Sequence, residues 1–193
     1  SFLLPIPRAD NATFSKFYYY DAGASSWRKG KGGPSLSCFT SLYRRHGMDF
    51  DRIEAWEPHT STDAFQRSVP AAFKDRVIFH QEYIAGRPNQ TNRQTFVPFW
   101  IRENTNPNDF VMFKLDIDNE PVEIGVVEYL LSEEGREDTK RLTEFYWEHH
   151  ARGNYFMSTG LQPGDDPLKK SLNASYHMFL QLRQAGIRAH SYV

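Results

Sequence analysis

Residues 109–123 read DFVMFKLDIDNEPVE and combine a short apolar run with a cluster of acids. The apolar run, residues 110–115, is too short for a typical helix, and this pattern predicts a strand buried on both faces of a parallel sheet. In open α/β sheets, ligands bind beyond the carboxyl ends of such strands. The acids after the run are therefore candidates for the floor of a functional site.

Four acids follow this strand, namely Asp116, Asp118, Glu120 and Glu123. One interpretation is that they only begin the next helix, whose first turn favours acidic side chains. Glu120 and Glu123 fit that interpretation, with Pro121 near the first helical position. Asp116 and Asp118 lie at the end of the strand itself, and for them we favour a functional role.

The rest of the chain alternates between strand-like and helix-like segments, which predicts an α/β fold with a mostly parallel sheet and helices on both faces. Residues 1–16 are interpreted as a leader or linker, and residues 17–193 as one domain. The predicted strands are 17–20, 50–56, 77–83, 110–115, 142–147 and 187–193. The predicted helices begin near Ser35, Ser61, Val122 and Pro167, while residues 96–102 fit either a helix or a strand.

Composition narrows the classes of function. A net charge of -1 gives no indication of a nucleic-acid partner, and no apolar run approaches the roughly 20 residues of a membrane span. A single cysteine, Cys38, excludes an internal disulfide and a cysteine-rich zinc site. A soluble, cytoplasmic protein is favoured, although glycosylation triplets at Asn11, Asn89 and Asn173 leave the Golgi or ER lumen open. The absence of an initiating Met suggests a domain of a longer protein.

Three predicted strands end in residues suited to binding a nucleoside. The first runs into Asp21-Ala22-Gly23, the second ends at Glu57, and the fourth at Asp116. A glycine at the first turn lets the backbone approach a ligand closely. An acid after the second strand can accept hydrogen bonds from both hydroxyls of a ribose.

The first turn also distinguishes between two cofactors. A dinucleotide site needs Gly-x-Gly-x-x-Gly, so that the pyrophosphate can lie at a helix N-terminus. Here Gly23-Ala24-Ser25 lacks the second glycine. Asp21 would repel a pyrophosphate but suits the cationic methionyl portion of S-adenosylmethionine. The sequence therefore favours S-adenosylmethionine over NAD.

These segments resemble the successive motifs of FkbM-type class I methyltransferases: YDAGA at 20–24, AWEP at 55–58 and FKLDID at 113–118. The resemblance extends from about residue 17 to the C-terminus and implies a Rossmann-like fold that methylates a hydroxyl, commonly of a sugar. It implies that Asp21, Gly23 and Ser25 contact the methionyl end and that Glu57 binds the ribose. Adenine would be held by the residues near the end of the third strand, Gln81, Glu82 and Tyr83.

The chain departs from that family in three places. Residues 27–34 form a basic, glycine-rich insertion, and Asp118-Asn119-Glu120 replaces the usual Glu-Gly. One strand follows the last helix, so the usual terminal hairpin is expected to be missing.

A second resemblance, to macrocin-type sugar O-methyltransferases, concerns a metal. It implies that Asp116, Asp118, Glu148 and His149 bind Mg²⁺ or, because a histidine is included, Mn²⁺. The metal would hold two sugar hydroxyls and lower the pKa of one of them. Without a metal, His149 or His150 would act as the general base, since imidazole titrates near neutrality.

The domain is also similar to the sugar-methylating domain of multidomain glycosyltransferases from large algal viruses, which would make a rhamnose-like sugar of a glycan the acceptor. Two alternatives remain open at this point. One is a non-catalytic sugar-binding module on a degenerate methyltransferase scaffold, favoured by the 15% content of aromatic residues. The other is an NAD-dependent dehydrogenase.

Overall fold

A computed structural model describes residues 14–29, 34–88, 95–149 and 171–191. Its strands are β1 (Phe17–Ala22), β2 (Arg52–Trp56), β3 (Val77–His80), β4 (Phe110–Leu115), β5 (Glu144–Trp147) and β6 (Arg188–Ser191). Its α-helices are α1 (Ser35–Arg45), α2 (Thr62–Ser68), α3 (Val97–Asn104), α4 (Glu120–Leu131), α5 (Arg136–Thr139) and α6 (Leu172–Gln184). A short 3₁₀ turn, Ala71–Phe73, follows α2.

The strands form one six-stranded sheet in the order β3-β2-β1-β4-β5-β6, and every pairing is parallel. The fold is thus α/β and Rossmann-like, as the alternation of segments predicts. The chain builds outward from β1 to β3 and then returns to place β4 on the other side of β1. In such sheets, the point where the strand order reverses is where ligands bind.

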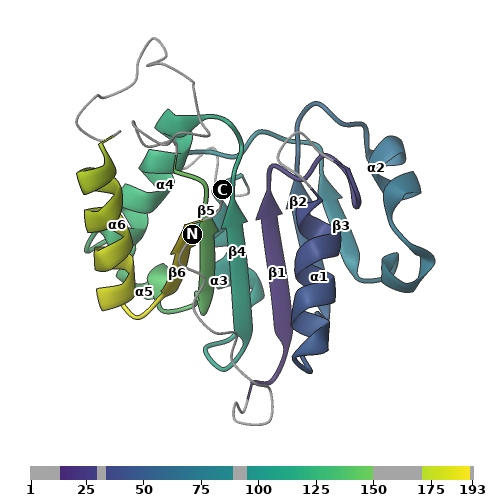
Figure 1. Cartoon of the computed structure of the whole chain (residues 1–193), viewed down its shortest axis with the longest axis horizontal. Helices are drawn as coiled ribbons and strands as arrows, with labels where there is room; N and C mark the ends of the chain where they lie inside the picture. Colours follow the sequence, from purple (N-terminus) through teal and green to yellow (C-terminus); the bar gives the residue numbers. More distant parts are fainter. Residues whose placement is uncertain (1–13, 30–33, 89–94, 150–170, 192–193) are drawn as a thin grey trace.

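The two faces of the sheet are covered by different helices (Figure 1). Successive side chains of a strand point to opposite faces, so Tyr18 and Tyr20 lie in one hydrophobic cluster and Tyr19 in the other. The cluster around Tyr19 includes side chains of α1 and α2, and the opposite cluster includes side chains of α3, α4 and α6. Both faces of β1 and β4 are therefore buried, which explains their aromatic and apolar sequences.

Local signals explain most of the helix boundaries. The hydroxyl of Ser61 accepts a hydrogen bond from the Ala64 N–H and begins α2, while the Asn119 side chain caps α4. Residues 97–104, undecided from sequence, form α3 with a proline in its first turn. The four-residue helix α5 was not predicted because a single turn carries no periodic signal.

Some sequence expectations are adjusted or lie outside the described residues. Strand β3 ends at His80 rather than at residue 83, and β5 begins at Glu144 rather than at residue 142. Most of the expected leader, residues 1–13, and the expected start of the last helix at Pro167 are not described. Within the described part of the chain, no helix is long and apolar enough to cross a bilayer.

Candidate functional site

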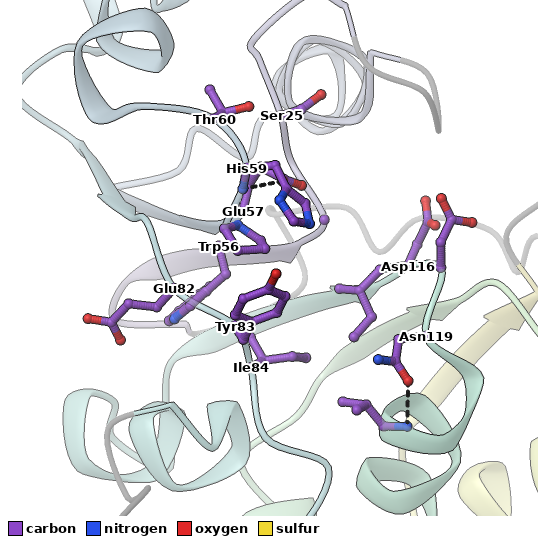
Figure 2. A pocket seen from close by; sticks show the side chains of 15 residues that line it. Ser25, Trp56, Glu57, His59, Thr60, Glu82, Tyr83, Ile84, Asp116 and Asn119 are labelled. Atoms are coloured by element: carbon purple, nitrogen blue, oxygen red, sulfur yellow. Dashed lines mark hydrogen bonds between the residues drawn. The ribbon is translucent and has the colours of Figure 1, made fainter. Parts of the chain in front are cut away.

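A cleft of about 610 Å³ opens at the carboxyl ends of β1, β2 and β4, where the strand order reverses (Figure 2). This volume is within the roughly 300–1,000 Å³ typical of small-molecule sites. Five of the seven residues expected to bind the cofactor line it, namely Gly23, Ser25, Glu57, Glu82 and Tyr83. The sequence therefore predicted the edge of the sheet at which the cleft opens, while the binding of a cofactor there stays a prediction.

Gly23 brings the ends of β1 and β4 together. Its φ of +102° lies in the left-handed region, and its N–H donates a hydrogen bond of 2.9 Å to the carbonyl of Trp56. A Cβ at this position would lie 1.6 Å from the carbonyl oxygen of Asp116. Only glycine fits both the conformation and the space, so the glycine expected to allow close approach of a ligand first allows close approach of two strands.

Glu57 follows β2 and lines the cleft. Its Oε1 accepts a hydrogen bond of 2.8 Å from the backbone N–H of His59, which holds the carboxylate in place. Figure 2 shows Glu57 beside His59 on one wall of the cleft. An ionised carboxylate here can accept hydrogen bonds from the two hydroxyls of a ribose.

The residues after β3 form the next part of the wall. Tyr83 is 68% exposed, and its ring meets the ring of His59 edge-on with centroids 5.6 Å apart. Glu82 and Ile84 line the cleft beside it. Gln81 does not, because its Oε1 accepts a hydrogen bond of 3.2 Å from the Thr62 N–H at the start of α2. The structure thus places Gln81 at the start of α2 rather than in the cleft.

Asp21, expected to contact the methionyl group, does not line the cleft. Its carboxylate is fully buried and accepts hydrogen bonds from the hydroxyls of Tyr19 (2.5 Å) and Ser35 (2.7 Å). The Nζ of Lys114 lies 3.2 Å from its other oxygen and 2.9 Å from Oδ2 of Asp116. A buried carboxylate needs such partners, so Asp21 fixes the base of the site.

The charged side chains that line the cleft are acidic. Among the described residues, four carboxylates line it, those of Glu57, Glu82, Asp116 and Asp118, and no lysine or arginine does. The side chain of Lys114 is 1% exposed and lies beneath Asp116 rather than in the cleft. A ligand with a pyrophosphate would be repelled here, whereas a ligand with a positive centre would be attracted.

Asp116, Asp118 and Glu148 converge at the rim of the cleft. One carboxylate oxygen of each lies within 4.8 Å of those of the other two, close enough to share one ion. Asp118 has a φ of +54°, a left-handed conformation that aspartate adopts more readily than most residues. All three side chains offer oxygen, the ligand type that Mg²⁺ and Mn²⁺ prefer. The residues present therefore fit a hard divalent cation.

Of the two histidines that the sequence predicts at this site, the structure describes His149 and not His150. His149 is buried, its ring stacks on Trp147 with centroids 4.4 Å apart, and its Nε2 lies 3.8 Å from Glu120. It is not a member of the acidic group, which consists of Asp116, Asp118 and Glu148. His150 lies outside the described residues.

Glu123, which the sequence explained as a residue of the first helical turn, has a second role. Its Oε1 accepts a hydrogen bond of 2.9 Å from the N–H of Ile117, and its Oε2 accepts one of 3.1 Å from Nε1 of Trp147. It therefore fixes the turn that carries Asp116 and Asp118. Burial raises the pKa of Glu123 to about 7.

Lys114 and the turn from Asn119 to Val122 are further parts of the site that sequence reasoning missed. Lys114 is one polar residue in a buried strand, which is itself a signal for a buried partner.

No family model, curated protein or solved structure matches the chain.

The acidic group is expected to hold a proton at neutral pH. Burial, a hydrogen bond with Asp116 and the negative charges of its neighbours raise the pKa of Glu148 to about 9. In the unfolded chain, this carboxyl would lose its proton near 4.5, the ordinary pKa of a glutamate. Between these values the unfolded state binds fewer protons than the folded state, so the free energy of unfolding falls as the pH rises from about 4.5 to about 9.

Glu148→Gln should remove this loss of stability at higher pH, because an amide does not ionise. In a metal-free buffer, the variant should match the wild type near pH 4 and be more stable at pH 8, as measured by urea unfolding. Glu134→Gln, at an exposed position, is the control for losing one carboxylate. If the free energies of unfolding of the two variants depended on pH in the same way, the raised pKa assigned to Glu148 would be wrong.

Proposed function

We propose that the chain is an S-adenosylmethionine-dependent O-methyltransferase that methylates a hydroxyl of a carbohydrate. The observation that carries this proposal is the acidic cleft at the point where the strand order reverses. Its four carboxylates, with no lysine or arginine beside them in the part of the chain that the structure describes, suit a nucleoside with a sulfonium cation. The same charge argues against NAD, whose pyrophosphate would face those carboxylates.

Each wall of the cleft supports a part of that cofactor. Glu57 is placed to accept the ribose hydroxyls, and Tyr83 and Ile84 offer an aromatic ring and an apolar surface for adenine. Gly23 and Ser25 offer backbone and hydroxyl groups for the methionyl end. The acids at the end of β4, Asp116 and Asp118, supply negative charge near a sulfonium group.

The acidic group supports the choice of a sugar hydroxyl as acceptor. A divalent ion held by Asp116, Asp118 and Glu148 would act as a Lewis acid toward two neighbouring hydroxyls. Asp116 belongs both to this group and to the cleft, so its carboxylate is placed to orient the acceptor hydroxyl and take up its proton. The acceptor oxygen then forms a bond to the methyl carbon while the carbon–sulfur bond breaks, leaving S-adenosylhomocysteine and a methyl ether.

The position of the ribose can be tested with Glu57→Gln. The amide oxygen can still accept the hydrogen bond from the His59 N–H, so the loop should be retained. Charge-assisted hydrogen bonds to the ribose are worth about 1.5–3 kcal/mol each. We therefore expect calorimetry to show at least tenfold weaker binding of S-adenosylhomocysteine.

Glu134→Gln should leave that affinity unchanged, since Glu134 is exposed on the loop before α5 and does not line the cleft. If Glu57→Gln bound S-adenosylhomocysteine as tightly as the wild type, the placement of the ribose beside Glu57 would be wrong. If the wild-type protein bound sugars but no adenosyl ligand, the non-catalytic sugar-binding alternative would replace the enzyme.

The metal part of the proposal has its own test, the titration of free Mn²⁺ by electron paramagnetic resonance. Asp118→Asn and Glu148→Gln should each weaken Mn²⁺ binding by at least tenfold, because each removes one of three ligands. His149→Gln should bind Mn²⁺ like the wild type, since His149 lies outside the acidic group.

A loss of affinity in His149→Gln equal to that in Glu148→Gln would restore the ligand set expected from sequence. No binding of Mn²⁺ at millimolar concentration would remove the metal and leave a carboxylate as the proton acceptor. Neither result would alter the test of the cofactor at Glu57.

A further inference from the structure

A second groove, of about 640 Å³, lies on the opposite side of the first loop from the acidic cleft. It is formed by Trp27 and Arg28, by the outer face of α1, and by Pro70 and Phe73 around the 3₁₀ turn. The loop after β1 joins the two sites, because Ser25 lines the cleft and Trp27 lines the groove. Nothing in the proposed transfer of a methyl group uses this second groove.

The groove is basic. Three arginines line it, Arg28, Arg44 and Arg45, and no aspartate or glutamate in the described ranges does. All three are exposed, and none forms an ion pair with any residue in the described part of the chain. Arginines in the last turn of a helix are favoured by its dipole, which accounts for Arg44 and Arg45 individually. It does not account for Arg28, which comes from a different segment and lines the same groove.

Helical spacing places hydroxyl groups beside the arginines. Ser37 and Ser41 are four residues apart on α1, and Arg44 follows three residues later, so the three share one face of the helix. The wall contributed by the loop is fixed, because the N–H of Trp27 donates a hydrogen bond of 2.9 Å to Ser68 and its carbonyl accepts one from Ser37. The groove therefore combines guanidinium groups and hydroxyl groups beside a wall that hydrogen bonds hold in place.

The amino-acid sequence supplies an independent reason to consider this groove. Residues 27–34, WRKGKGGP, are a basic, glycine-rich segment with three basic residues and three glycines. The described part of that segment supplies Trp27 and Arg28 to the groove. Arg28 thus brings positive charge from this loop to the same groove as Arg44 and Arg45 of α1.

We propose that this groove binds a sugar that carries a phosphate or sulfate ester. The planar guanidinium groups are suited to hold the ester oxygens in pairs, and the serines are suited to the sugar hydroxyls. The inference goes beyond the proposed methyl transfer and does not depend on it.

A nucleic acid fits the groove less well. Trp27 is 2% exposed and packs against Phe73 with ring centroids 4.6 Å apart, so its face is not open to a base. The guanidinium of Arg76 lies 5.2 Å from the centre of the Phe73 ring. The chain has a net charge of -1, and the neighbouring cleft is acidic, so an extended polyanion would be repelled.

The test is calorimetric titration with glucose 6-phosphate, glucose 6-sulfate, inorganic phosphate and glucose. We expect one molecule of either ester to bind per chain, more tightly than inorganic phosphate or glucose. Arg28→Gln and Arg44→Gln should each weaken binding about tenfold. Arg67→Gln, an exposed arginine in the last turn of α2 that does not line the groove, is the matched control and should have no effect.

Cys38 gives a second readout, since it lines the groove, is exposed and is the single cysteine of the chain. Saturating ester should slow its reaction with a thiol reagent, and Arg28→Gln should abolish that protection. Equal weakening by Arg67→Gln, or no protection of Cys38, would overturn the site. Tighter binding of a single-stranded oligonucleotide than of either ester, or of inorganic phosphate than of its sugar ester, would overturn the carbohydrate ligand.

Discussion

The buried ammonium of Lys114 holds together the part of the sheet on which the candidate site depends. It lies between the carboxylates of Asp21 on β1 and Asp116 after β4, and Asp21 and Lys114 are direct partners in the sheet register. Removing one member of a buried ion pair typically costs about 3–5 kcal/mol, because the partner is left charged and unpaired. Beside this pair, Gly23 lets the carbonyl of Asp116 approach β1 more closely than any side chain would allow. These two constraints fix where β1 and β4 separate, and hence where the cleft opens.

Acidic and basic side chains line two separate sites, one on each part of the loop that follows β1. The ammonium of Lys114 lies beneath the cleft between the carboxylates of Asp21 and Asp116, while no lysine or arginine among the described residues lines the cleft itself. The loop that begins at Gly23 then crosses to a groove where arginines collect and acids are absent. A cation-bearing cofactor and an anionic sugar would each meet a surface of opposite charge. The two proposals share this loop but rest on separate residues.

The sequence predicted the α/β fold and seven of the fifteen residues that line the cleft, because both depend on local patterns. Apolar runs that end in Gly23, Glu57 and Asp116 place those residues at one edge of a parallel sheet whatever the strand order. The direction of a side chain is harder to predict, because it depends on which strands become neighbours. Asp21 faces Lys114 only because β4 returns beside β1, and the ring of His149 stacks on Trp147 rather than joining the acidic group. The structure therefore brings Asp116, Asp118 and Glu148 together, as the sequence predicts for these acids, while His149 lies outside that group and the binding of a metal stays a prediction.

The central claim is that the charge of the cleft selects a cationic adenosyl cofactor over a dinucleotide. The most direct measurement is a calorimetric titration of the same protein with S-adenosylmethionine and with NAD at equal, low ionic strength. The account predicts saturable binding of S-adenosylmethionine below millimolar concentration and binding of NAD at least a hundredfold weaker, with the four cleft carboxylates responsible for the difference. Equal or tighter binding of NAD would contradict the account.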